Sequence, residues 1–218
     1  MTADTTCKSL MGLYRKERFL ARFHVRTRYR RALYDELLGY VPESGSILDI
    51  GCGHGVFANL CALTSAARDI TGIDVSGDKI AVAKRTIGAR RNVHFQIADA
   101  LHYIPRNTPD VILCMDTMYL IPFDLQETML SVFSERLAAD GLLMINEVCR
   151  DRSFGFRKAM LQEYVSVRIL RITSGDGLYY RSVQEWTGLL EERGFSVRVI
   201  KRHTPNPTHL FLCRKKHG

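Results

Sequence analysis

An acid and three alternating glycines follow an apolar run in the pattern D-x-G-x-G-x-G, formed by Asp49, Gly51, Gly53 and Gly55. Glycine suits places where the backbone needs a positive φ or where a ligand touches the main chain. A carboxylate two residues before the first glycine would repel a pyrophosphate but would attract a ligand with a cationic centre. A helical pattern starts at Val56, so the loop lies at the carboxyl end of a strand, where open α/β sheets bind ligands. The pattern predicts a binding loop for a small molecule that carries positive charge.

Two other glycine-rich loops do not fit these residues. A dinucleotide-binding loop requires G-x-G-x-x-G/A, whereas the sixth position counted from Gly51 is Val56. A phosphate-binding P-loop requires G-x-x-x-x-G-K-[ST], which the sequence lacks. A purely structural glycine turn remains as the alternative.

Acids at the ends of two later strands argue against that alternative. Asp74 ends the second predicted strand, 19 residues after Gly55, and Asp99 follows the third. A carboxylate about 20 residues after the glycines can accept hydrogen bonds from both ribose hydroxyls of a nucleoside. Each acid alone could instead cap the next helix, a role that Ser76 could also fill.

Strand and helix patterns alternate through the middle of the chain. The strands are predicted over 47–50, 70–75, 93–98, 111–115 and 142–148, and the helices over 56–65, 78–87 and 125–138. Such alternation indicates βαβ units and a parallel sheet with helices on both faces.

The last part of the chain has a different pattern. A helical pattern covers 156–170, and Ser182 and Glu185 have capping-box spacing for a further helix. Two final strands are predicted over 195–201 and 209–214, separated by a turn at 205–207. Strands this close must be antiparallel, because a parallel crossover needs a dozen or more residues.

This order of motifs resembles the class I methyltransferases that use S-adenosylmethionine, in particular the small-molecule type (methyltransferase type 11/12). The resemblance covers about residues 40–150 in good motif order and residues 177–214 more loosely. It implies an α/β, Rossmann-like, doubly wound and mostly parallel seven-stranded sheet that ends in an antiparallel hairpin, with helices on both faces. It also implies S-adenosylmethionine as cofactor and S-adenosylhomocysteine as product. The residues that it places at the cofactor are Asp49, Gly51, Cys52, Gly53, His54, Gly55, Asp74, Val75, Lys79, Ala98, Asp99, Ala100, Met115 and Tyr119.

The implied reaction is direct displacement at the sulfonium methyl group, for which the protein mainly holds the reactants in line. A general base is needed only if the acceptor must lose a proton. The candidates near the predicted strand ends are His54, Asp116, Tyr119 and Glu147. His54 could instead offer its backbone N–H to the cofactor, and Asp116 could cap the following helix.

Charge is unevenly distributed along the 218 residues. Residues 1–42 carry net +5, residues 43–150 net −4 and residues 151–218 net +7, which gives +8 in total. We expect one domain with a basic helical lid (1–42), a cofactor-binding core (43–150), a substrate-cap excursion (151–181) and a C-terminal helix and hairpin (182–218). Basic residues mixed with aromatic ones favour a partly apolar, anionic acceptor, although a charge run can also be a solvated helix face. The candidate acceptor contacts are Arg22, Arg26, Tyr164, Tyr179 and Tyr180.

Three kinds of function remain open. The first is methylation of a small metabolite, free, carried on an acyl carrier protein or presented at an anionic membrane surface. The second is methylation of RNA or protein, although no Asn/Asp-Pro-Pro-Tyr signature follows the fourth strand and no Pro-Cys pair occurs. The third is a non-catalytic binding protein that keeps the fold.

The composition also gives expectations for the location of the protein, the state of its thiols and metal binding. No apolar run reaches the roughly 18–20 residues that span a bilayer, and the first residues lack the apolar core of a secretory signal. The six cysteines form no C-x-x-C pair and have no histidine at metal spacing. We therefore expect a cytoplasmic protein, in part peripheral to the membrane, with reduced thiols and no metal site.

Overall fold

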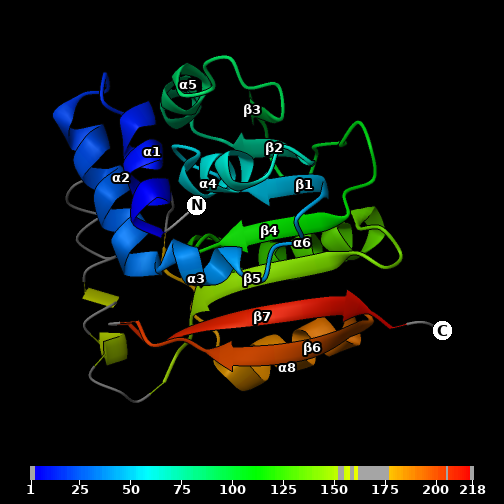
Figure 1. The fold of residues 1–218 in the computed structure, drawn as a ribbon. Coiled ribbons are helices and arrows are strands. Elements are labelled where there is room, and N and C mark those ends of the chain that lie inside the picture. Colours follow the sequence, from blue (N-terminus) through cyan, green and yellow to red (C-terminus); the bar gives the residue numbers. More distant parts are fainter. Residues whose placement is uncertain (1–2, 152–154, 158–159, 162–176, 205, 217–218) are drawn as a thin grey trace. The chain divides into compact units, whose positions relative to one another are not determined.

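The computed structural model describes residues 3–151, 155–157, 160–161, 177–204 and 206–216. It contains a seven-stranded sheet in the order β3-β2-β1-β4-β5-β7-β6 (Figure 1). β1, β2 and β3 pair in parallel, whereas β7 pairs antiparallel with both β5 and β6. This confirms the predicted mixed sheet with a terminal hairpin.

The chain divides into two compact units, Met1–Val111 and Ile112–Gly218, which are described separately. The organisation as a single domain with four functional segments stays a prediction. The elements of the first unit are α1 (Ala3–Leu13), α2 (Phe19–Ala32), α3 (Tyr34–Leu38), β1 (Gly45–Ile50), α4 (Val56–Thr64), β2 (Arg68–Asp74), α5 (Gly77–Arg85) and β3 (Val93–Ile97).

The first unit packs α4 and α5 against β2 and β3, and α1, α2 and α3 against α4. In β3, Val93 and Phe95 are buried whereas His94 is exposed and Gln96 half-buried. This alternation is typical of a strand with one face in the core and one near solvent. The more polar face lines a groove of about 590 Å³.

The second unit begins within β4 (Val111–Met115). Its other elements are η1 (Met118–Leu120), α6 (Phe123–Arg136), β5 (Leu142–Val148), α8 (Val183–Glu192), β6 (Phe195–Lys201) and β7 (Thr208–Lys215). The capping box of α8 is confirmed, because Ser182 Oγ accepts from Glu185 N at 3.2 Å while Glu185 Oε2 accepts from Ser182 N at 2.6 Å. Most of the helix predicted over 156–170 lies outside the described residues.

The strand bounds agree with the predicted ones to within about two residues, because each strand is a short apolar run bounded by turn residues. Three helices, α1, α2 and α3, occupy the segment expected to form a basic helical lid, and the first of them starts at Ala3.

Candidate active site

The glycine loop has the left-handed backbone that its sequence predicts. Gly51, Gly53 and Gly55 have φ values of 67°, 54° and 73°. At Gly55 a side chain is excluded by space as well, because a Cβ there would lie 2.5 Å from the Cζ of Phe95. The ring of Phe95 on β3 therefore packs directly against the loop and helps to fix its path.

Asp74 joins the glycine loop to the end of β2. Its Oδ2 accepts a hydrogen bond from Gly53 N at 2.9 Å, and its Oδ1 accepts from Ser76 N at 2.8 Å. Ser76 caps α5, with its hydroxyl accepting from Lys79 N at 3.5 Å. The helix cap is thus Ser76, and the Asp74 carboxylate retains lone pairs for further donors.

Asp49 is 2% exposed at the end of β1. Burial, together with the neighbouring Asp74 carboxylate, raises the pKa of this carboxyl group to about 7, although a hydrogen bond from the Ala58 backbone opposes the shift. A buried carboxylate is costly in the absence of a compensating charge. A cationic group beside Asp49 would therefore stabilise its ionised form and release a proton on binding.

The raised pKa of Asp49 predicts a pH-dependent stability. The folded protein holds a proton on Asp49 up to pH about 7, whereas the unfolded chain loses it near the ordinary value of 3.8. The contribution of Asp49 to the free energy of unfolding is therefore complete below pH 3.8, and it decreases as the pH rises towards 7. Asp49→Asn keeps an acceptor oxygen but carries no charge. The free energy of unfolding of the variant, compared with that of the wild type, should therefore increase by up to about 4 kcal/mol between pH 4 and pH 8.

Urea unfolding at several pH values measures this difference. Asp69→Asn, at an exposed acid of β2, is the matched control and should follow the wild type at every pH. A constant difference between Asp49→Asn and the wild type across this range would contradict the shifted pKa.

A network of buried polar side chains is hydrogen-bonded to the backbone of the glycine loop. Tyr14 and Asn59 are 1% and 0% exposed. Tyr14 Oη donates to the carbonyl oxygen of His54 at 2.8 Å and accepts from Asn59 Nδ2 at 2.9 Å. Asn59 Nδ2 also donates to Thr86 Oγ1, and Arg90 Nη2 donates to Asn59 Oδ1 at 2.7 Å. The end of α1 is thus hydrogen-bonded to the backbone of the glycine loop.

α2 also lies close to the loop. The rings of His24 and His54 have their centroids 5.0 Å apart. Burial lowers the pKa of both histidines, to about 4 for His24, and for His54 the charge of Lys79 lowers it further. Both imidazoles are therefore neutral at physiological pH.

In the second unit, Asp116 directly follows β4 and has a positive φ of 53°. Its Oδ1 accepts from Asn146 Nδ2 at 2.9 Å, and Asn146 Oδ1 accepts from Arg202 Nη1 at 3.0 Å. Asn146 and Arg202 are 0% and 3% exposed. The side chain of Asp116 is therefore bonded to Asn146 of β5, which in turn accepts from Arg202 after β6. Asp116 does not cap α6, whose N-terminal flank is Pro122.

Glu147 is fully buried on β5. Its Oε1 accepts from the backbone N–H groups of Thr117 and Met118, both at 2.8 Å. Met115, a predicted cofactor contact, is 5% exposed at the end of β4. Glu147 thus fixes the backbone that follows β4.

Two of the three tyrosines predicted at the acceptor lie together with Tyr119. Tyr119 and Tyr180 stack with centroids 5.3 Å apart, and Phe156 meets Tyr180 edge-on at 5.2 Å. Tyr179 N donates to the carbonyl of Tyr119 at 2.7 Å. Tyr164 lies outside the described residues. In the first unit, Arg22 and Arg26 are exposed on α2.

The motifs gave no indication of Gln126 on α6, which is fully buried. Its Nε2 donates to the carbonyl oxygens of Met118, Ile121 and Tyr179, and its Oε1 accepts from Arg181 Nε at 2.7 Å. One amide thus holds the segment after β4 against the segment before α8. Tyr14, Asn59, Asn146 and Arg202 are further residues that the spacing did not reveal, because each acts through partners far away in sequence.

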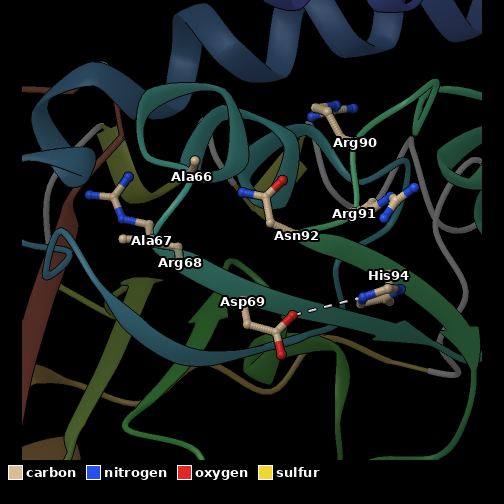
Figure 2. A pocket seen from close by; sticks show the side chains of 8 residues that line it. All are labelled: Ala66, Ala67, Arg68, Asp69, Arg90, Arg91, Asn92 and His94. Atoms are coloured by element: carbon tan, nitrogen blue, oxygen red, sulfur yellow. Dashed lines mark ion pairs between the residues drawn. The ribbon is translucent and has the colours of Figure 1, made fainter.

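A shallow pocket of about 600 Å³ lies elsewhere, at the amino ends of β2 and β3 (Figure 2). Its most buried arginine, Arg68, is already bonded to three backbone carbonyls, those of Pro42, Cys61 and Val41. The glycine loop lies at the carboxyl end of β1, so this pocket is not part of the candidate site.

A family model described as a methyltransferase domain matches residues 20–199, which is most of the chain. The chain belongs to the methyltransferase family. S-adenosylmethionine is the cofactor of this class I family, as the loop and the strand-end acids predict.

Two relatives of this methyltransferase match over part of their length. A malonyl-[acyl-carrier protein] O-methyltransferase of Ilyobacter polytropus is 26% identical over 134 residues, 60% of this chain and 51% of that protein. A trans-aconitate 2-methyltransferase of Delftia acidovorans is 31% identical over 115 residues, 50% of this chain and 41% of that protein. The chain therefore spans about half the length of the curated relatives it matches, or less.

Solved structures share the fold of this methyltransferase. The pyocyanin biosynthetic protein PhzM has a TM-score of 0.72 at 19% identity, over 94% of this chain and 60% of its own. Magnesium protoporphyrin IX methyltransferase (ChlM) of Synechocystis PCC 6803, solved with bound S-adenosylhomocysteine, has a TM-score of 0.67 at 17% identity, over 97% and 95%. At such identities the likeness establishes the fold.

The first unit of the methyltransferase fits an adenosyl group. Val75 and Ile97, at the ends of β2 and β3, are 63% and 61% exposed and offer apolar surface to a ring. Asp74 directly precedes Val75 and pairs with Ile97 in the strand register. Asp99 is also exposed, with Oδ1 accepting from Leu101 N at 2.9 Å. Apolar surface flanked by carboxylates suits a nucleoside, which has a flat ring and several donors.

In the residues that the structure describes, no three His, Cys, Asp or Glu side chains gather as metal ligands. Over the same residues, every helix is too short or too polar to cross a bilayer.

Proposed function

We propose that this protein transfers the methyl group of S-adenosylmethionine, by direct displacement, to an oxygen of a small, partly apolar and anionic acceptor. The observation that carries the proposal is the glycine loop, with Gly53 N bonded to Asp74 and the buried Asp49 at its base. The I. polytropus relative is named as an O-methyltransferase, which supports oxygen as the acceptor atom.

The cofactor supplies the chemistry as an activated methyl donor with a neutral leaving group. The protein's residues position it. Asp74 would accept from the ribose hydroxyls while it holds Gly53, and the carbonyl of His54 is fixed by Tyr14. Asp49 places a buried carboxyl group beneath the loop, where it favours a positive charge. Holding reactants in an attack geometry is the main rate contribution such a site can make.

The contacts of the four candidate general bases help to choose the class of acceptor. Asp116 is bonded to Asn146, Glu147 to two backbone N–H groups, and Tyr119 is 4% exposed in an aromatic stack. Burial, followed by the charge of Lys79, lowers the pKa of the fourth candidate, His54, which weakens it as a proton acceptor. A carboxylate acceptor has no proton to lose at neutral pH, so methylation of a carboxylate needs none of these groups as base. We therefore favour methyl ester formation.

Charge supports an anionic acceptor. The first 42 residues and the last 68 carry net +5 and +7, against −4 in between. The I. polytropus relative is named for a malonyl group on an acyl carrier protein, which makes a carrier-bound carboxylate a candidate for this chain as well.

Transfer of labelled methyl groups from S-adenosylmethionine tests the proposal. The panel contains free dicarboxylic acids, the same acyl groups on an acyl carrier protein, a phenol, total RNA and a protein extract. Label in a carboxylic acid that is released by mild alkali, as methyl esters are, supports the proposal. Label in RNA or protein, or in an alkali-stable ether of the phenol, overturns the acceptor class. Binding of S-adenosylhomocysteine in calorimetry without transfer to any acceptor favours the non-catalytic alternative.

A further inference from the structure

One side of α2 carries exposed apolar side chains beside exposed arginines. Phe19, Leu20 and Phe23 are 75%, 78% and 61% exposed. The rings of Phe19 and Phe23 stack with their centroids 6.3 Å apart. Together with four exposed arginines these residues form the α2 face, which consists of Arg18, Phe19, Leu20, Arg22, Phe23, Arg26 and Arg30.

Helical spacing places the apolar and basic residues on one stripe. Phe19, Phe23, Arg26 and Arg30 follow one another at intervals of four, three and four residues, so they lie along the same side of the helix. Another side of α2 is buried and packs in the first unit, where α1 and α2 lie side by side (Figure 1). The core therefore orients the α2 face outward.

The α2 face has a single sign of charge. Between Arg18 and Ala32 the sequence has six arginines and no acidic residue. The acid nearest in sequence, Glu17, is held in a bidentate ion pair by Arg85 of α5, at 2.7 and 2.8 Å. The positive charge of the arginines in residues 18–32 is therefore not offset by any acid of the same segment.

We propose that the α2 face binds an anionic lipid bilayer. Arginines beside Phe and Leu suit the boundary between headgroups and acyl chains, where the cations contact lipid phosphates and the apolar side chains leave water. An RNA partner would use the arginines but would leave the aliphatic side chain of Leu20 without a role. Clustered exposed apolar side chains on a folded protein mark an interaction surface more often than isolated ones do.

Flotation with lipid vesicles tests the proposal on the full chain. The protein should float with vesicles of phosphatidylcholine mixed with phosphatidylglycerol and stay unbound with phosphatidylcholine alone. Replacing Phe19, Leu20 and Phe23 together by Gln should weaken binding roughly tenfold or more, because the charge is kept and only the apolar contact is lost. Replacing Arg26 and Arg30 by Gln should weaken it by a similar factor.

Matched variants outside the α2 face control for general effects. Ile104→Gln replaces the most exposed apolar side chain, at 82%, in the segment between β3 and β4, and Arg91→Gln removes an exposed arginine before β3. Both should bind vesicles as the wild type does. Full binding by the apolar triple variant, combined with salt-sensitive binding of RNA, would assign the face to nucleic acid and overturn the proposal.

A tryptophan reporter measures insertion directly. The chain has one tryptophan, Trp186, which is 1% exposed in α8 and should not respond to vesicles. Phe23→Trp should show a blue shift in fluorescence with anionic vesicles, and its absence would contradict insertion. The measurement needs no methyl donor, so this inference and the proposed methyl transfer can fail separately.

Discussion

Gly55→Ala should destabilise the protein more than any other single change considered for the glycine loop. The added Cβ would lie 2.5 Å from the ring of Phe95 and 3.1 Å from Ala83. The residue would also keep a φ of 73°, which is strained for alanine. Overpacking and a left-handed backbone cost about 1–3 and 1–2 kcal/mol respectively, so we expect a loss near 3–4 kcal/mol in urea unfolding.

Gly88→Ala separates the two causes. Gly88 has a φ of 60° but no atom within 4 Å of its Cβ position. This control should lose only the roughly 1–2 kcal/mol of backbone strain. Adding Phe95→Leu to Gly55→Ala should relieve part of the clash. Equal losses for Gly55→Ala and Gly88→Ala would mean that Phe95 does not constrain the loop.

Asp74→Ala should cause the largest loss of cofactor affinity. The change removes the acceptor for Gly53 N and the carboxylate that would bind the ribose hydroxyls. Hydrogen bonds to charged groups contribute about 1.5–3 kcal/mol each, so the dissociation constant of S-adenosylhomocysteine should rise roughly a hundredfold. Isothermal titration calorimetry measures this directly.

Asp78→Ala is the matched control for Asp74→Ala, because Asp78 is an exposed acid in the first turn of the adjoining helix α5. It should bind S-adenosylhomocysteine as the wild type does. A folded Asp74→Ala protein with unchanged affinity would remove Asp74 from the cofactor site and would leave it only the role of holding the loop.

The left-handed glycine loop and the acids beside it could be predicted because their signals are local. Asp49 and the glycines lie within seven residues, and each later acid follows an apolar strand. Parallel strands bring such ends to one edge of a sheet, so spacing along the chain translates directly into position. The same locality explains why the strand bounds agree so closely.

The rest of the site depends on partners that no spacing rule connects. Tyr14 and Asn59 are 45 residues apart and Asn146 and Arg202 are 56 apart, and each pair meets only in the folded chain. Gln126 was not predicted because a buried amide inside a helix has the same sequence signature as an exposed one. Tyr179 and Tyr180 stay predicted acceptor contacts, and spacing did not predict that both would contact Tyr119.

The hydrogen bond from Tyr14 to the His54 carbonyl affects how the catalytic unit should be delimited. The family match begins at residue 20, after α1. A protein trimmed to that boundary would keep every residue of the glycine motif but would lose Tyr14, whose hydroxyl accepts from the buried amide of Asn59. An unsatisfied buried polar group costs about 1–3 kcal/mol. We therefore expect the minimal stable unit to start upstream of the family match, at α1, and truncations for expression or for grafting should retain that helix.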